Sequence, residues 1–139
     1  MFMRTILILF LFTFGRSLAA DSAKSADVRP ALSYPSQAAI SQWATNAFGG
    51  SRIDLYKHNA GEVLVVWRSF TSGVTTSDLC FFVQSRNRWK LALWYPVRGE
   101  GLKTEERGDG IDILYYDAQQ NKWARRLSIS YEALFDIGA

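Results

Sequence analysis

Three side chains in the sequence have the chemistry of a general acid or base: Asp54, His58 and Asp78. A carboxylate or an imidazole moves a proton to or from a substrate when it lies within hydrogen-bond reach in a pocket. If one of them does so, the chain is a small enzyme with a pocket between a helix and a sheet. Such an enzyme requires a cavity that encloses a carboxylate of raised pKa.

The sequence lacks the residues that other catalytic arrangements require. Nucleophilic catalysis needs a base beside the nucleophile, and the only histidine, His58, falls in a predicted hairpin turn. Zinc sites of ordinary composition need more than the single histidine and single cysteine present. The cysteine, Cys80, alternates with apolar neighbours in a predicted strand, which indicates a buried, inert thiol. We therefore expect no catalytic residue, no metal site and no cofactor, and favour a function other than catalysis.

Aromatic residues on the predicted strands are more informative than the catalytic types. Because side chains alternate between the faces of a sheet, Phe82, Trp94 and Tyr116 are expected on the face opposite to a second aromatic set. One helix covers only one of these faces. An exposed aromatic face is typical of a binding surface, and the alternatives are a second buried layer or a dimer interface.

Polar residues at predicted turns are expected at the rim of such a surface. Arg88 and Lys122 lie at the ends of two similar hairpins, in each of which an aromatic pair and a polar turn precede a tryptophan. The aromatic pair and the tryptophan are expected to meet across the hairpin. The segment from Arg98 to Gly110 is rich in glycine and acidic residues and has no apolar periodicity, so it is predicted to be a loop. It contains Arg107-Gly108-Asp109, which spells an integrin-binding tripeptide or simply indicates a turn. Arg107 and Asp109 join the candidate binding residues.

The strands that must position these residues follow from the run Glu62 to Tyr95. Valine and aromatic residues fill Val63 to Trp67, Leu79 to Val83 and Trp89 to Tyr95, and small or polar residues separate them. Such segments suit a pleated, packed surface. The strand from Val63 to Phe70 is apolar on both sides, which indicates a central strand covered on both faces. Together with similar segments before and after this run, the pattern predicts a meander of about six antiparallel strands.

An amphipathic helix is predicted ahead of the sheet. Ser36 has the chemistry of an N-cap, and apolar residues from Ile40 to Phe48 recur at helical spacing. Gly49-Gly50 is expected to end the helix. The predicted fold class is therefore α+β, with one N-terminal amphipathic helix packed on the antiparallel meander.

The N-terminal residues predict an address outside the cytoplasm. Residues 1–20 combine Arg4, an apolar stretch and small residues before Asp21, as a secretory signal peptide does. Residues 21–35 contain two prolines and predict a flexible leader, and residues 36–139 predict a single α+β domain. We expect a periplasmic or secreted protein with no stable membrane insertion after signal cleavage.

Net charge restricts the partners. The formal charge is +3, and removal of Arg4 and Arg16 with the signal leaves +1, which gives no reason to expect a nucleic acid. The leading hypothesis is an exported, non-catalytic module that binds an unknown protein or small ligand through an aromatic sheet face or the 98–110 loop. A small acid/base enzyme and a homodimer that uses the exposed sheet face as its interface are the alternatives.

Overall fold

A computed structural model describes residues 29–47, 49–72, 74–98 and 102–139. The chain divides at Pro30, and the fold is that of the unit Ala31–Ala139. The predicted signal peptide and the predicted leader up to residue 28 lie outside the described residues.

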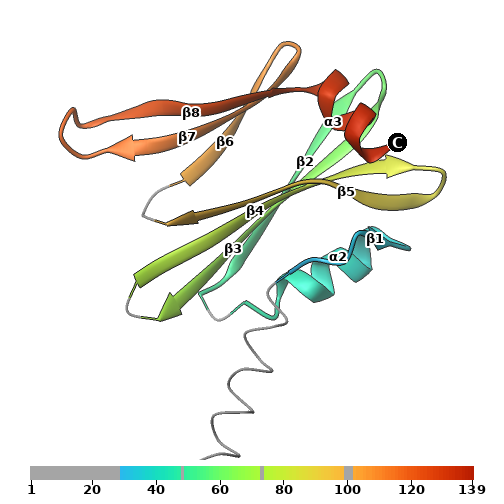
Figure 1. Cartoon of the computed structure of the whole chain (residues 1–139), viewed down its shortest axis with the longest axis horizontal. Coiled ribbons are helices and arrows are strands. Elements are labelled where there is room, and N and C mark those ends of the chain that lie inside the picture. The colour runs from blue at the N-terminus through green and yellow to red at the C-terminus, as the bar shows by residue number, and fades with distance from the viewer. Residues whose placement is uncertain (1–28, 48, 73, 99–101) are drawn as a thin grey trace, which may run out of the picture. The chain divides into compact units, whose positions relative to one another are not determined.

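Antiparallel strands make up most of this unit (Figure 1). The strands are β1 Ser33–Tyr34, β2 Ser51–His58, β3 Gly61–Ser72, β4 Val74–Ser85, β5 Arg88–Arg98, β6 Leu102–Arg107, β7 Gly110–Asp117 and β8 Lys122–Ser130. The helices are α2 Gln37–Ala44 and α3 Tyr131–Gly138. Five strands form sheet A in the order β1-β5-β4-β3-β2, and three form sheet B in the order β6-β7-β8.

The predicted fold class is wrong. The described residues form two sheets and two short helices, rather than one meander under one N-terminal helix. The difference begins between Arg98 and Gly110, the predicted loop, because Leu102–Arg107 forms β6 and pairs with β7. Leu102 is the only apolar residue of β6, so the strand has no apolar alternation to reveal it. Pairing with β7 determines its conformation.

The N-terminus of α2 confirms the predicted cap. The Ser36 hydroxyl oxygen accepts a hydrogen bond from the Ala39 backbone N–H at 3.2 Å, which satisfies a donor that the first turn leaves unpaired. Ile40 and Ala44, one turn apart, are both completely buried. The helix therefore packs its predicted apolar side against sheet A.

The C-terminus of α2 differs from the prediction. The helix ends at Ala44 with Thr45 as its cap, before Gly49-Gly50. The Thr45 hydroxyl donates to the Gln42 carbonyl at 2.8 Å, and such local side-chain bonds compete with further helix. Phe48, the last residue of the predicted apolar stripe, lies outside the described residues.

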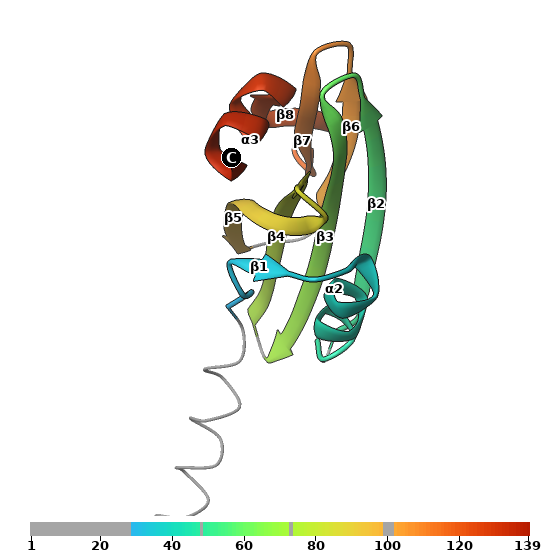
Figure 2. The same cartoon turned by 90° about the vertical axis from the view of Figure 1, so that its right-hand side faces the viewer.

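Sheet A has a core on each face (Figure 2). In β3, Val63 and Val65 face sheet B and α3, while Leu64 and Val66 face β1 and α2. The strand is thus apolar on both sides because both sides are covered. Cys80 is fully buried in the core on the α2 side, which confirms the prediction for the thiol.

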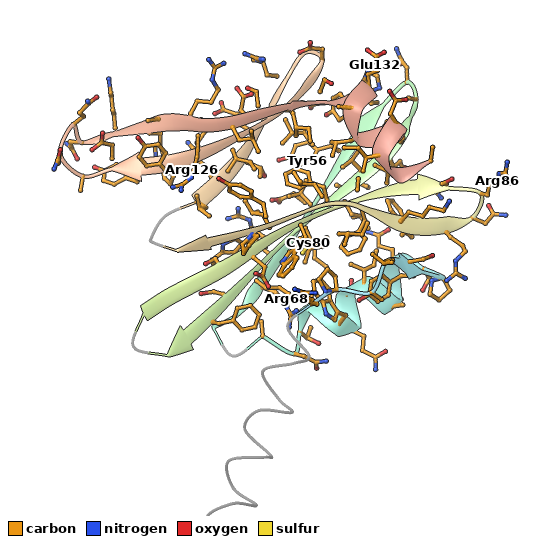
Figure 3. All side chains as sticks on the ribbon, in the orientation of Figure 1. Tyr56, Arg68, Cys80, Arg86, Arg126 and Glu132 are labelled. Carbon is orange, nitrogen blue, oxygen red and sulfur yellow. The ribbon has the colours of Figure 1, made fainter. Side chains whose placement is uncertain are left out.

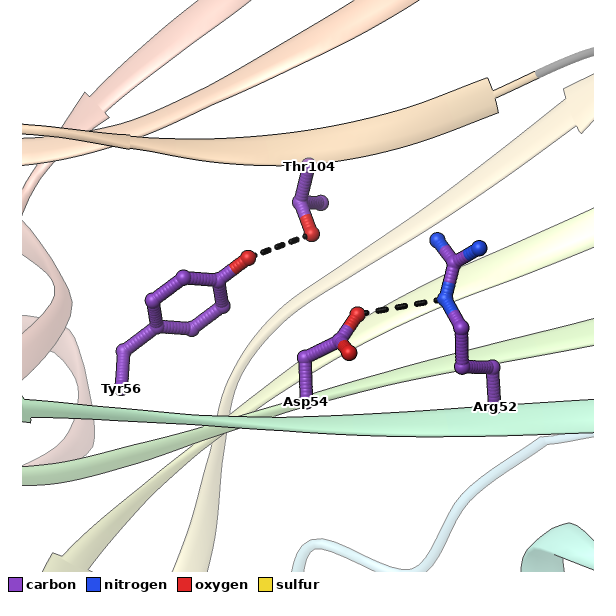
Figure 4. Close-up of polar contacts among 4 residues, drawn as sticks. All are labelled: Arg52, Asp54, Tyr56 and Thr104. Carbon is purple, nitrogen blue, oxygen red and sulfur yellow. Dashed lines mark hydrogen bonds and ion pairs between the residues drawn. The ribbon is translucent and has the colours of Figure 1, made fainter.

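Polar contacts join the two sheets and α3. The Tyr56 and Thr104 hydroxyls share a hydrogen bond of 2.8 Å between β2 and β6 (Figure 4). The Tyr131 hydroxyl donates to Glu106 Oε1 at 2.6 Å, and the His58 ring stacks on Tyr131 with centroids 4.4 Å apart. Burial and the neighbouring Glu106 raise the pKa of Tyr131. These contacts fix sheet B and α3 against the end of sheet A.

α3 closes the core between the sheets. Leu134 is fully buried and Phe135 is partly buried against the same core. At its end, Gly138 packs so closely that an added Cβ would overlap the Cγ2 atom of Val83. The C-terminal residues therefore contribute to the core.

Gly138→Ala is expected to destabilise the fold. The methyl group has to displace Val83 or lift the end of α3, and overpacking of this kind costs about 1–3 kcal/mol of unfolding free energy. Urea unfolding should show the loss, while Ile137→Ala, at a neighbouring position that is 60% exposed, should change the midpoint little. Equal midpoints for Gly138→Ala and the wild type would show that α3 does not pack as described.

Candidate binding surface

The three candidate acid/base residues do not share a site. Asp54 lies on the face of β2 that points toward sheet B, where its Oδ2 accepts from Arg52 Nε at 3.2 Å (Figure 4). His58 stacks on Tyr131 of α3. Asp78 lies on the opposite face of sheet A, in the region of α2. The structure therefore gives no support to their joint action as an acid and a base.

Asp78 belongs to a buried charged cluster with Arg68, its cross-strand partner. Arg68 is 1% exposed and Asp78 is 4% exposed. The Arg68 guanidinium lies 4.1 Å from the centroid of the Trp43 ring and 4.9 Å from that of Phe70; Figure 3 shows it on the α2 side of sheet A. Burial raises the pKa of Asp78, and the Trp94 side chain and the Arg68 charge oppose that rise. Because Trp43 belongs to α2, this cluster anchors the helix on the sheet.

The raised pKa of Asp78 predicts a pH-dependent contribution to stability. Below about pH 4, near the ordinary pKa of an aspartate, the folded and unfolded states both hold the proton and the contribution is complete. As the pH rises through the raised folded pKa, the folded state must ionise a buried group, so the contribution is lost. Asp78→Asn should remove this part of the pH dependence of urea unfolding, measured from about pH 3 to about pH 7. If the unfolding free energies of the wild type and Asp78→Asn change with pH in the same way, the prediction is contradicted.

Two of the predicted binding residues lie in the core beneath α2 and β1. Phe82 is completely buried, with its ring 5.5 Å from Tyr34 and 6.1 Å from Trp43 between centroids. Trp94 is partly buried against the same cluster. Because α2 covers this face of sheet A and Tyr34 packs on Phe82, the Phe82 ring has no surface to offer a partner.

Three further predicted residues lie in two separate places. Arg88 begins β5, and its Nε donates to Ser33 Oγ of β1 at 2.8 Å. Arg107 and Asp109 lie at the turn between β6 and β7, where Arg107 Nε is 3.7 Å from Asp112 Oδ1. The predicted turn is confirmed, but Arg88 belongs to sheet A and the turn to sheet B.

Tyr116 and Lys122 lie together on the hairpin of β7 and β8. Tyr116 is the cross-strand partner of Trp123, and their rings meet edge to face with centroids 5.5 Å apart. This contact confirms the predicted aromatic pairing across the hairpin. Each ring is 41% exposed. The Lys103 ammonium lies 4.5 Å from the centroid of the Trp123 ring, a cation–π arrangement.

The turn of this hairpin holds the aromatic pair in place. The Asp117 carboxylate accepts from the backbone N–H groups of Gln119 and Gln120 at 3.0 and 3.3 Å. Asn121 follows in the left-handed region, with φ of 52°, which asparagine tolerates. Its side-chain oxygen accepts from the Tyr116 hydroxyl. The two rings are therefore presented by an ordered turn.

Basic residues surround the pair. Arg125 lies two positions after Trp123 in β8, so the two side chains share a face of the sheet. Leu114 of β7 pairs with Arg125 on one side and with Lys103 of β6 on the other, which places Lys103 on the same face. Lys103, Lys122 and Arg125 make no ion pair with any described residue. We use the term aromatic hairpin surface for four residues on one face of sheet B. They are Lys103, Tyr116, Trp123 and Arg125. Lys122 adjoins Trp123 in β8 and so lies on the other face, where its cross-strand partner is Asp117.

Sequence reasoning missed three members of the aromatic hairpin surface. It assigned Lys103 to a loop, grouped Tyr116 with rings that belong to sheet A, and did not include Trp123 or Arg125 as binding residues. The available signal was the aromatic pair, polar turn and tryptophan that predicted the Tyr116 contact. Alternation from Trp123 would have added Arg125.

No protein-family model, curated protein or solved structure matches this chain. Each helix in the described part has eight residues, and neither has the length and apolar character needed to span a membrane. Among the described residues, no three His, Cys, Asp or Glu side chains gather in an arrangement that could hold a metal ion.

Proposed function

We propose that the protein is a non-catalytic binding module that engages an acidic partner protein through the aromatic hairpin surface. One observation carries this proposal: Tyr116 and Trp123 are large, exposed and in contact with each other. The other exposed large apolar side chains in the described chain, Leu32, Leu55 and Ile137, lie on separate segments. Contiguous exposed aromatic area is typical of recognition sites, whereas single exposed apolar residues are ordinary.

The charges around the rings favour an acidic partner. Lys103, Lys122 and Arg125 make no ion pair with a described carboxylate, so their charges can attract Asp or Glu residues of a partner. Such complementarity raises the rate of encounter and selects against basic partners. The hairpin turn reduces the ordering cost on binding, because Asn121 and Asp117 already restrain it.

Selection from a random peptide display library tests the proposal. Peptides that bind the wild type should be enriched in Asp and Glu with at least one apolar residue, and should lose binding to Trp123→Ala. Leu55→Ala removes an apolar side chain of matched exposure, 42% against 41%, and should bind the same peptides as the wild type does. Peptides that are not acidic, or that bind Trp123→Ala unchanged, would refute the proposal.

A further inference from the structure

β8 is a free edge of sheet B. The order β6-β7-β8 leaves its outer side without a neighbouring strand. In the described chain, no backbone hydrogen bond joins that side to another segment. β8 also carries Trp123 and Arg125 of the aromatic hairpin surface, and Lys122 on the opposite face. Its unpaired N–H and C=O groups form a template for one more strand.

β8 differs in charge from the other edge strands. β1 has two uncharged residues, and β2 and β6 each mix basic with acidic residues. β8 has three basic residues and no acidic one. They are Lys122, Arg125 and Arg126.

The first half of β8 is the part best suited to an added strand. Lys122 to Arg125 pair with β7 in regular register, and the register then shifts so that Arg126 has no partner in β7. The Arg126 side chain turns toward sheet A, where its Nε donates to the Tyr95 hydroxyl at 3.2 Å. The charges of Lys122 and Arg125 therefore remain for a partner.

We propose that β8 accepts an extended acidic segment of the partner protein as an additional antiparallel strand. This inference rests on the proposed function and specifies how the partner is held. The added backbone supplies hydrogen bonds that do not depend on sequence, and alternate side chains supply specificity. The residue opposite Trp123 shares its face and is expected to be apolar, while those opposite Lys122 and Arg125 are expected to be acidic. The recognised pattern is acidic-any-apolar-acidic.

A second copy of this chain is a poor occupant of the same edge. Two β8 strands could pair in an antiparallel manner through Lys122–Arg126. The basic residues of both copies would then lie close together, and neither strand has an acidic residue to pair with them. Like charges set opposite one another destabilise a strand pair. The edge is thus protected from self-association and open to an acidic strand.

The test uses the purified protein and a synthetic peptide, acetyl-Thr-Glu-Thr-Val-Glu-Val-Thr-amide, which contains the pattern. Two further versions carry backbone N-methyl groups on alternate residues, in the odd or the even set. Because successive N–H groups of a strand point to opposite edges, one set blocks pairing with β8 and the other leaves it intact. We expect one methylated peptide to bind at least about tenfold more weakly and the other to match the parent.

Charge exchange tests the acidic specificity separately. Binding of the parent peptide to Arg125→Glu should be about tenfold weaker than to the wild type. A peptide with lysine in place of both glutamates should bind Arg125→Glu more tightly than it binds the wild type. Strand addition is overturned if the parent peptide does not bind or if both methylated peptides bind as the parent does. If the methylated peptides match the parent and Trp123→Ala still weakens binding, the proposed function survives without strand addition. Unchanged binding of the parent to Trp123→Ala rejects the proposed function itself.

Discussion

Arg68→Met is expected to lower the free energy of unfolding at neutral pH by about 3–5 kcal/mol, because it leaves the Asp78 carboxyl buried without its compensating charge. The variant also loses the guanidinium contacts with Trp43 and Phe70. Methionine keeps a long apolar side chain at this position, so the loss reports on the charge more than on volume. Urea unfolding at pH 7 measures it. That pH is about three units above the ordinary pKa of an aspartate.

The double variant provides the control. If the cost of Arg68→Met arises from an uncompensated carboxyl, adding Asp78→Leu should recover most of it, since apolar residues often replace a buried charged pair without loss of stability. If the double variant loses as much unfolding free energy as the two single variants together, Arg68 and Asp78 act independently. A loss below about 1 kcal/mol for Arg68→Met would show that its charge does not matter to Asp78.

Trp123→Ala is expected to weaken binding of the acidic partner by about thirtyfold, the effect of a tryptophan at the centre of an interface. The side chain lies between Tyr116 and Lys103, so its removal leaves both without their contact. Isothermal titration with a peptide from the display selection measures the change. The free energy of unfolding should fall by no more than about 1 kcal/mol, because the ring is well exposed.

Leu55→Ala is the matched control for that prediction. Leu55 lies on β2 of sheet A and is as exposed as Trp123. A general loss of apolar surface would affect both variants, while a specific site affects only Trp123→Ala. Equal weakening in the two variants would contradict a localised binding surface.

Local patterns predicted several elements of this fold. Ser36 caps α2 because its hydroxyl oxygen is the nearest acceptor for the first turn. β3 alternates between two apolar faces, which predicted a central strand covered on both sides. The Tyr116–Trp123 contact followed from the short turn between them, since the turn length sets which residues face each other. The cap and the aromatic contact each depend on an interaction within a few residues or within one hairpin.

Assignment of strands to sheets could not be read from such patterns. Alternation shows which residues of one strand share a face, but not which sheet the strand joins. Phe82 and Trp94 belong to sheet A and Tyr116 belongs to sheet B, so one aromatic face was predicted where the chain has two separate regions. β6 was missed for a related reason, because long-range pairing forms it without an apolar repeat of its own.

Indole resonances offer the most direct measurement of the central claim, that the partner binds on the aromatic hairpin surface. The protein has five tryptophans, and each indole N–H gives one signal in a ¹H–¹⁵N spectrum. On titration with the acidic peptide, the Trp123 signal should shift most and lose its shift in Lys103→Ala or Tyr116→Ala. The signals of Trp43, Trp67, Trp89 and Trp94 should remain near their free positions. A stationary Trp123 signal beside a shift at Trp67 or Trp94 would place the contact on sheet A and contradict the account.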